Sequence, residues 1–337
     1  MAELKTTYMG LELKNPVIAG ASTMTKNLDV IKRIEDAGTA GLVTSSLFEE
    51  EIELERFKFE EDLSKFNDKH PEMISIFPDI EHAGPEEHLM WVRKAKEAVS
   101  IPVIGSLNAV NIETLHDYAR KMEQTGVDAL ELNLYRFPSK SADAADAIEK
   151  EQLQQLKALL GTVSIPVSVK LSPFYTNALN FISALDNMGV AGFVLFNRFF
   201  QPDIDIDAEK NTFPFHLSNR EDSRLPLRYT GLLYDALQGD ICSSTGLMNA
   251  EDVLKMLLAG ASCVQVVSTL YKNKVAAVES IVKGIETWMD KKGYGSLNDF
   301  RGKLSSKNSS EPGTYTRAQY VKLLLHPEII TENYPVM

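Results

Sequence analysis

Short apolar segments alternate with longer amphipathic segments along most of this 337-residue chain. The short segments are nearly continuous apolar runs, which is typical of parallel strands buried on both faces. The alternation therefore predicts repeated βα units. Eight strands are expected, at Val17–Ala21, Gly41–Ser45, Ile101–Ser106, Ala129–Leu134, Val167–Leu171, Gly192–Phe196, Ile241–Ser244 and Cys263–Ser268. This number favours a closed α/β (β/α)8 barrel of the TIM type, although an open doubly wound sheet also fits the pattern.

Capping residues mark the helices between these strands. Asn27–Ala37 has apolar residues at three-and-four spacing and ends before Gly38, and Thr114–Gln124 ends in the same way before Gly126. Glycine just beyond the last turn is a common helix C-cap. Asn249 precedes two acidic residues and an apolar run, so we expect it to be a helix N-cap.

The phrase VSIPV occurs twice, at Val99–Val103 and at Val163–Val167, and introduces a strand each time. Proline near the start of a strand is compatible with a parallel barrel. We interpret the repetition as a sign of repeated structural units.

Two longer polar segments follow the second and the sixth strand. Phe48–Glu97 is rich in charge, which is typical of a solvated helix and loop but also fits a lid over the C-terminal face of the barrel. Arg198–Leu227 is expected to form a lid or a subunit contact. We predict one barrel over residues 1–304, and a C-terminal linker with a short docking helix over residues 305–337.

The charge balance limits the partners that the chain can take. A net charge of −12 repels nucleic acid and anionic membranes, while a local basic pocket can still bind an anionic small-molecule substrate. The N-terminal segment lacks the pattern of a signal peptide, and no apolar run reaches membrane-spanning length. The sequence therefore predicts a cytoplasmic protein with neither a nucleic-acid nor a membrane partner.

Cys242 and Cys263, the two cysteines of the chain, both lie in apolar runs. We expect them to be reduced residues of the core. Two cysteines are too few to ligate an iron–sulfur cluster within this chain, and we predict no metal site.

Polar residues at the C-terminal ends of barrel strands are the first candidates for chemistry. SSTG at Ser243–Gly246 and VST at Val267–Thr269 end the last two strands, where barrels commonly bind a phosphate, although each could be a simple serine-rich turn. Lys170 is expected at the barrel mouth, because a buried lysine needs an anionic partner; the alternative is a salt-bridged rim residue. Three asparagines offer donors and acceptors suited to the edge of a planar heterocycle, or are turn residues: Asn108, Asn133 and Asn197.

A phosphate site beside a central lysine and amides describes a site for flavin mononucleotide (FMN), and several phrases make the pattern specific. They are LKNPVIAGAS near the N-terminus, ELNL at Glu131–Leu134, PVSVKLSP around Lys170, FN at Phe196–Asn197, and STGLMNAEDVLKMLLAGASCVQVVSTL followed by KKGYGSLNDFRGKL. In their order and spacing, the chain resembles the dihydroorotate dehydrogenase family over about residues 5 to 304. The resemblance implies that residues 1–304 form a single FMN-binding barrel.

The resemblance also implies roles for individual residues. Lys170 is expected to face flavin N1 and the C2 carbonyl, where a fixed cation stabilises the charge that develops on reduction. The cofactor is expected to contact Ala19, Gly20, Ala21, Thr44, Asn108, Lys170, Asn197, Ser244, Thr245, Gly246, Ser268 and Thr269. The substrate is expected to contact Asn133, Asn197, Arg198 and Asn108.

The substrate half departs from the family pattern. The family reads N-L-S-C-P-N or N-V-S-S-P-N, with the Cys or Ser as the base, where residues 133–138 of this chain read NLYRFP. Arg136 stands in place of the base, and an arginine is a poor proton acceptor because it stays protonated. Tyr135, Ser45 or His82 are candidates for proton transfer instead, and Arg136 with Arg198 could hold a carboxylate.

Three further features of the family are absent or altered. No lysine lies near Thr44–Ser46, the substrate loop at residues 77–82 reads FPDIEH, and the glycine pair after the sixth strand is missing. Arg228, in the phrase LRYTG, lies near the position where the family has this glycine pair. It is a candidate to compensate for the absence of the pair. These changes predict FMN binding with an altered substrate site.

The leading hypothesis is an FMN-dependent oxidoreductase that transfers hydride between flavin N5 and a C–C bond next to a carbonyl, with dihydroorotate as the favoured substrate. One alternative is a phosphate-binding barrel lyase or isomerase that uses Lys170 as a Schiff-base amine. Another is a flavin-binding protein with impaired catalysis. The soluble single-chain relatives imply a homodimer, which we expect, and a separate electron-transfer partner stays open as an alternative.

Overall fold

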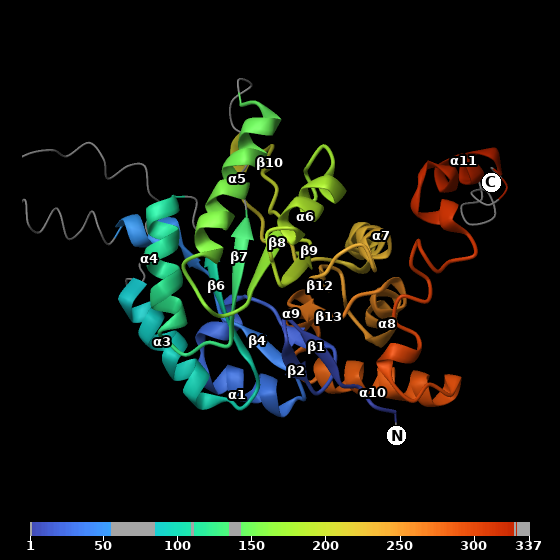
Figure 1. The fold of residues 1–337 in the computed structure, drawn as a ribbon, viewed down its shortest axis with the longest axis horizontal. Helices are drawn as coiled ribbons and strands as arrows, with labels where there is room; N and C mark the ends of the chain where they lie inside the picture. The colour runs from blue at the N-terminus through green and yellow to red at the C-terminus, as the bar shows by residue number, and fades with distance from the viewer. Residues whose placement is uncertain (1, 55–84, 109–110, 135–142, 327, 329–337) are drawn as a thin grey trace, which may run out of the picture.

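The computed structural model describes residues 2–54, 85–108, 111–134, 143–326 and 328. Eight parallel strands form its centre: β3 (Val17–Ala19), β4 (Gly41–Val43), β6 (Val103–Asn108), β7 (Ala129–Leu134), β8 (Val167–Leu171), β9 (Gly192–Leu195), β12 (Asp240–Ser244) and β13 (Cys263–Val266). Each strand pairs with the next, β13 pairs with β3, and β4 pairs with β6, so the ring closes. The short β5 (Leu47–Phe48) continues the pairing along β6. The closed (β/α)8 barrel is confirmed, and the open sheet is excluded (Figure 1).

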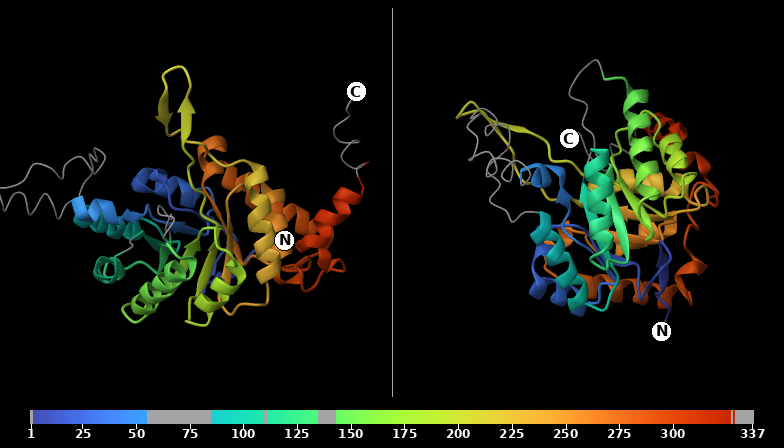
Figure 2. Two further views of the ribbon diagram at one scale, coloured as in Figure 1. Left: turned by 90° about the horizontal axis from the view of Figure 1, so that it is seen from above. Right: turned by 60° about the vertical axis from the view of Figure 1, so that its left-hand side comes forward.

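Helices surround the barrel on its outer face (Figures 1 and 2). They are α1 (Leu28–Asp36), α3 (Pro85–Ala98), α4 (Ile112–Glu123), α5 (Ala145–Leu160), α6 (Ala178–Asp186), α7 (Arg224–Leu233), α8 (Ala250–Ala259) and α10 (Ala277–Lys292). The predicted N-cap is confirmed, because the Asn249 side chain accepts a hydrogen bond from the Asp252 N–H. Asn27 caps α1 in the same way, through the Val30 N–H. Both side chains satisfy a backbone donor that the first helical turn leaves without a partner.

An N-terminal hairpin closes one end of the barrel. This hairpin was not predicted from the sequence. It consists of β1 (Thr6–Tyr8) and β2 (Leu11–Leu13), and Tyr8 is fully buried against apolar side chains of the barrel interior. The Met9 N–H donates to the Asp240 carboxylate at 2.8 Å. A Cβ on Gly192 would lie 2.9 Å from the Tyr8 ring, so glycine is required for this contact. The hairpin leaves the opposite, C-terminal end of the strands as the open face.

The structure corrects the extent of the first insertion. Helix α3 falls inside the predicted Phe48–Glu97 segment, and it packs on the barrel through His88, Leu89, Val92 and Ala95. It is therefore the barrel helix that precedes β6, and not part of a lid. Residues 55–84, which make up most of the rest of that segment, lie outside the described residues.

The second insertion contains a hairpin that projects from the body, drawn in yellow in Figure 2. The hairpin consists of β10 (Asp203–Asp205) and β11 (Lys210–Thr212), and a 3-10 turn follows at η2 (Arg220–Ser223). The last four residues of the predicted segment Arg198–Leu227 belong to α7, so the segment was predicted to extend too far, into a barrel helix.

Beyond α10 the chain forms η3 (Leu297–Asp299), η4 (Pro312–Tyr315) and the expected short helix, α11 (Arg317–Leu325). Arg228 on α7 donates to the Tyr315 carbonyl and to the Gln319 side chain. Arg228 thus binds the C-terminal segment. The expectation that it compensates for the missing glycine pair at the barrel mouth is wrong. The domain division at residue 304 stays a prediction.

Cys242 and Cys263 are free and buried on adjacent strands, as expected. Burial raises the pKa of the Cys263 thiol well above its ordinary value. Within the described ranges, no helix is long and apolar enough to cross a membrane.

Candidate functional site

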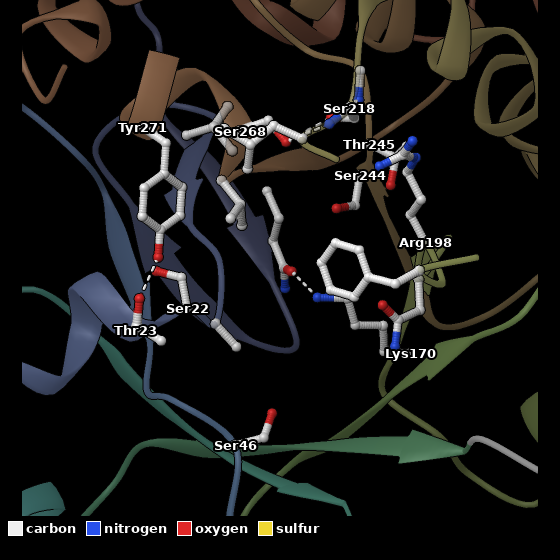
Figure 3. Close-up of a pocket in the computed structure, with 18 of the residues that line it drawn as sticks. Ser22, Thr23, Ser46, Lys170, Arg198, Ser218, Ser244, Thr245, Ser268 and Tyr271 are labelled. Carbon is white, nitrogen blue, oxygen red and sulfur yellow. Dashed lines mark hydrogen bonds between the residues drawn. The ribbon is translucent and has the colours of Figure 1, made fainter. Parts of the chain in front are cut away.

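A cavity of about 350 Å³ opens at the C-terminal ends of the strands. Many of the predicted site residues line it, namely Ala21, Ser45, Lys170, Asn197, Arg198, Ser244, Thr245, Gly246 and Ser268. Figure 3 shows how they are distributed: Ser244, Thr245, Ser218 and Ser268 gather at one end, Ser46 lies at the other, and Lys170 lies between them. The cavity therefore brings together the hydroxyl-rich turns and the central lysine.

The other predicted residues lie behind this lining or outside the described residues. Thr44 is fully buried, and its hydroxyl accepts from the Ser106 N–H at 3.1 Å, while the Thr269 hydroxyl donates to the Met248 carbonyl. The remaining four lie on or beside the strands without lining the cavity: Ala19, Gly20, Asn108 and Asn133. Tyr135, Arg136 and His82 fall outside the described residues.

The floor of the cavity carries a buried charged group around Lys170. Lys170 Nζ lies 3.0 Å from Gln265 Oε1 and 3.4 Å from Glu131 Oε1. Gln265 also donates through Nε2 to the second carboxylate oxygen of Glu131. Glu131 is fully buried, and Lys170 is 7% exposed. The three side chains satisfy one another, which holds the ammonium at the floor of the cavity as a fixed cation.

Amides and hydroxyls form a chain beside this group. Asn197 Nδ2 donates to Asn133 Oδ1 at 3.4 Å, and Asn133 Nδ2 donates to Ser106 Oγ at 3.1 Å. Ser106 Oγ in turn lies 2.8 Å from Ser46 Oγ, which lines the cavity. Asn133 thus orients groups at the surface of the cavity rather than lining it. The two asparagines lie at neighbouring strand ends and are joined by a hydrogen bond, and their role in binding a substrate stays a prediction.

Two hydroxyls at the cavity are buried without a hydrogen-bond partner among the described residues. They belong to Ser22 and Ser45. A buried hydroxyl without a partner costs about 1–3 kcal/mol, so each is suited to a polar ligand atom. Ser45 was predicted from the end of the second strand, whereas Ser22 was not.

The turn after β12 forms the opposite end of the cavity. Thr245 and Gly246 have φ angles of +82° and +78°, and the Thr245 hydroxyl donates to the Phe196 carbonyl at 3.0 Å. A Cβ on Gly246 would lie 2.5 Å from the Ser223 nitrogen, so the loop after β11 packs directly on this glycine. Turns of this kind commonly direct backbone N–H groups toward an anion, and here the Gly246 N–H donates to Ser218 Oγ, which lines the cavity.

Arg198 reaches this same end. Its guanidinium donates to the His216 carbonyl and lies 3.5 Å from the Asp222 carboxylate. In Figure 3 the guanidinium lies beside Thr245, on the far side of the cavity from Ser46. The predicted pairing of Arg198 with Arg136 stays a prediction, because Arg136 lies outside the described residues.

Several residues that line the cavity come from loops and were not predicted from the sequence. Phe200 and Phe215, whose ring centroids lie 4.7 Å apart, both line the cavity and come from the second insertion. Tyr271 and Thr23 close another wall through a hydrogen bond of 2.6 Å between their hydroxyls (Figure 3). Lys26 also lines the cavity and provides a cation from the loop after β3. Strand-end reasoning could not find Phe215, which lies 20 residues beyond the end of β9. It also passed over Thr23, Lys26 and Tyr271, which lie in the short turns and helices that follow a strand.

Comparison with known proteins gives a consistent match. A family model described as dihydroorotate dehydrogenase matches residues 80–289. A protein of Methanocaldococcus jannaschii is 28% identical over 282 residues, which cover 80% of this chain and 87% of that protein. A protein of Thermoplasma volcanium is 27% identical over 311 residues, covering 90% and 98%, and one of Petrotoga mobilis is 27% identical over 315 residues, covering 90% and 99%. All three relatives are named dihydroorotate dehydrogenase B (NAD(+)), catalytic subunit.

Proposed function

The chain belongs to the dihydroorotate dehydrogenase family, whose members are oxidoreductases acting on CH–CH bonds, and we propose that its cavity binds FMN and oxidises a pyrimidine-like ring. The favoured reaction converts dihydroorotate to orotate, with hydride transfer between the substrate C–C bond and flavin N5. The observation that carries this proposal is the position of Lys170, a buried cation between the hydroxyl-rich turn and the amide chain.

The donor set of the cavity fits FMN. Anion-binding groups lie at one end, where Thr245, Gly246 and Ser268 meet, and a cation lies at the floor. The partnerless hydroxyls of Ser22 and Ser45 offer hydrogen bonds to the polar edge of a ring. Apolar walls suit the faces of an aromatic system, as is usual in cofactor pockets.

Lys170 provides the electrostatic part of the reaction. FMN, when bound, supplies the hydride acceptor. A fixed ammonium stabilises negative charge that develops near it, and burial strengthens this interaction relative to water. Because Glu131 and Gln265 hold Nζ in place, the cation needs little reorganisation during the reaction.

Substrate oxidation also releases a proton, since one hydrogen leaves as hydride and the other as H⁺. Among the predicted proton-transfer groups, Ser45 lies in the described part of the chain and lines the cavity. We assign it the role of proton relay, in which Ser45 Oγ accepts the proton from the substrate while its own hydroxyl proton passes to water, with Asn133 and Asn197 orienting the substrate side. Arg136 and Tyr135 keep their predicted roles in substrate binding and proton transfer.

The experiment is an anaerobic mixing of the purified holoprotein with dihydroorotate, followed by absorbance of the flavin. We expect a yellow protein that is bleached within the dead time of manual mixing. A colourless protein that does not take up added FMN would contradict the cofactor assignment. A yellow protein that dihydroorotate fails to bleach would contradict the substrate assignment alone.

The structure gives little support to the lyase or isomerase alternative. A Schiff-base lysine must present a free amine, and Lys170 Nζ is engaged by both Glu131 and Gln265. Borohydride treatment with a carbonyl substrate should therefore leave the mass of the protein unchanged. The other alternative, a flavin protein with impaired catalysis, predicts bound FMN that no electron donor reduces at a useful rate.

A separate electron-transfer subunit completes the proposal. The relatives are named catalytic subunits of an NAD(+)-dependent enzyme, which supports a partner that connects the flavin to NAD⁺. The isolated chain should then reduce an artificial dye acceptor and not NAD⁺. The homodimer and the cytoplasmic location rest on resemblance and on the sequence pattern, and they stay predictions; light scattering of the purified chain tests the first.

A further inference from the structure

Ser218 occupies a central position at the hydroxyl-rich end of the cavity, although no strand-end pattern points to it. It lies in the loop after β11, is 5% exposed and lines the cavity. The Gly246 N–H donates to Ser218 Oγ at 3.2 Å. Ser218 Oγ then donates to Ser268 Oγ at 2.7 Å, and the Ser218 N–H donates to the same oxygen at 3.0 Å. Ser218 therefore joins two groups predicted to hold the phosphate.

These bonds determine which proton remains available. Ser268 Oγ accepts twice from Ser218, so its own hydroxyl proton is left to donate into the cavity. Gly246, Ser218 and Ser268 form a donor chain in which each bond polarises the next. Such a chain strengthens its terminal O–H as a donor, and its natural acceptor is an anionic oxygen.

Basic residues hold the loop that carries Ser218 from both sides. Lys272 Nζ donates to the Ser218 carbonyl and to Asn219 Oδ1, each at 2.8 Å. Arg198 donates to the His216 carbonyl, two residues earlier. The loop is thus held by two cations, of which Arg198 is paired with Asp222, while Lys272 contacts neutral oxygens and raises the local potential at this end of the cavity. Figure 3 shows Ser218 directly beside Ser268 as a result.

We propose that Ser218 is a positioning residue for the phosphate of the cofactor, acting through the hydroxyl of Ser268. This inference rests on the proposed FMN binding. It identifies the second insertion as part of the phosphate site, in a chain that lacks the glycine pair expected after the sixth strand. The contribution is specific to the phosphate, because the donor chain ends at the anion-binding end and not at the ring.

The test compares the affinities of FMN and riboflavin, which differ only in the phosphate. The full chain, freed of bound flavin, is titrated with each, and flavin fluorescence reports binding. In Ser218→Ala we expect FMN affinity to fall about 10-fold, the size of one lost hydrogen bond, while riboflavin affinity changes less than about 3-fold. In Ser218→Asp we expect a loss of FMN affinity above about 100-fold, since a carboxylate repels the phosphate, again with riboflavin little changed. The exposed hairpin variant Ile206→Ala should bind both flavins like the parent chain.

The outcomes separate this inference from the proposed function. Equal losses for both flavins would show a merely structural effect of Ser218 and overturn the inference, as would an unchanged FMN-to-riboflavin ratio in both variants. A parent chain that binds neither flavin would overturn the proposed function and the inference together. Thermal unfolding of each variant shows whether it is folded, and Ser218→Ala, which removes a single oxygen, serves if Ser218→Asp does not fold.

Discussion

Lys170 Nζ lies 3.4 Å from Glu131 Oε1 at the floor of the barrel cavity, and both side chains are withdrawn from solvent. A buried ion pair of this kind contributes little net stability, but removing one partner leaves an uncompensated charge. The pair therefore links the stability of the barrel to the placement of the cation that we propose for catalysis. Separate measurements of folding and of turnover can resolve these two effects.

The first prediction concerns that pair. Lys170→Met should lower the free energy of unfolding by about 3–5 kcal/mol, because Glu131 is left buried without its cation. The double variant Lys170→Met with Glu131→Gln should regain most of this loss, since both charges are then gone. Both variants should stay at least about 100-fold slower in flavin reduction by substrate, the scale of losing one preorganised electrostatic group.

Urea unfolding and anaerobic stopped-flow absorbance provide the two measurements. Lys157→Met, an exposed lysine on α5, is the matched control and should change neither. A single variant as stable as the parent, or a double variant with restored turnover, would contradict this account of Lys170.

The second prediction concerns the turn at Gly246. Gly246→Ala and Gly189→Ala place the same residue at φ angles of +78° and +92°, so their backbone penalties are similar, about 1–2 kcal/mol. Only at Gly246 does the new Cβ meet neighbouring atoms, at 2.5 Å from Ser223 N and 2.7 Å from Asn219 O, while nothing lies within 4 Å at Gly189. Gly246→Ala should therefore displace the Ser218 loop and weaken FMN binding more than about 10-fold.

Fluorescence titration with FMN, together with thermal unfolding, checks this comparison. Gly189→Ala should bind FMN like the parent protein and show only the backbone cost in stability. Equal FMN affinities in the two variants would mean that the loop does not depend on the glycine, and the description of this turn would be wrong.

The strand ends could be predicted from sequence because a parallel barrel aligns the C-terminal ends of all its strands at one face. Lys170, Thr245 and Ser268 were predicted in this way. They lie at the same cavity although they are far apart in the sequence. Ser218 could not be found, because its position depends on how the loop after β11 folds back over Gly246. Helix α3 was misread as part of an insertion, because a charged run precedes it and its buried stripe is narrow.

The repeated phrase VSIPV shows a similar limit. The sequence predicts two equivalent strand starts. The structure shows that each copy of the phrase is bound by a glutamate that lies elsewhere in the chain. Glu35 Oε1 accepts from the Ser100 N–H, the Ser100 hydroxyl and the Ile101 N–H. Glu123 Oε1 accepts from Ser164 and the following isoleucine in the same pattern. Each glutamate lies near the end of a helix far from its partner in sequence, so the pairing is a tertiary feature.

The third prediction follows from these glutamates. The hydrogen bonds from Ser164 lower the pKa of Glu123 below its ordinary value of 4.5. Burial opposes ionisation of Glu35, but its bonds to Ser100 and Ile101 together outweigh burial and lower its pKa as well. A carboxyl whose pKa is lower in the folded state stabilises the protein above pH 4.5, and this contribution disappears as the pH falls through the lowered value.

Glu123→Gln should therefore lower the free energy of unfolding at pH 7 by about 1 kcal/mol or less, since the group is only half-buried and water screens its charge. The difference from the parent should shrink as the pH falls below 4. Urea midpoints at pH 7 and pH 3.5 measure it, with Glu209→Gln on the exposed hairpin as the control. A difference that grows toward acid would show that the hydrogen bonds do not favour the ionised carboxylate.

The last prediction concerns His88 on α3, which is 9% exposed and whose Nε2 has no hydrogen-bond partner among the described residues. Burial, reinforced by the nearby Lys26 cation, lowers the pKa of His88 to about 4 from its ordinary 6.5. The unfolded chain therefore takes up a proton below pH 6.5 that the folded protein resists until about pH 4. It follows that the neutral imidazole stabilises the fold fully above pH 6.5, and that this stability is lost progressively as the pH falls toward 4.

His88→Phe keeps an aromatic ring and removes the titration. At 1.36 kcal/mol per pKa unit, the stability of the parent relative to this variant should fall by about 2 kcal/mol between pH 7 and pH 5. Urea unfolding at the two pH values measures the change, and the difference cancels the contribution of the carboxylates common to both proteins. Ile206→Phe, at an exposed position of the hairpin after β10, should show no such change. A parent-to-variant difference that stays constant over this range would mean that His88 is protonated within the fold, and that α3 packs on the barrel with room for a charge.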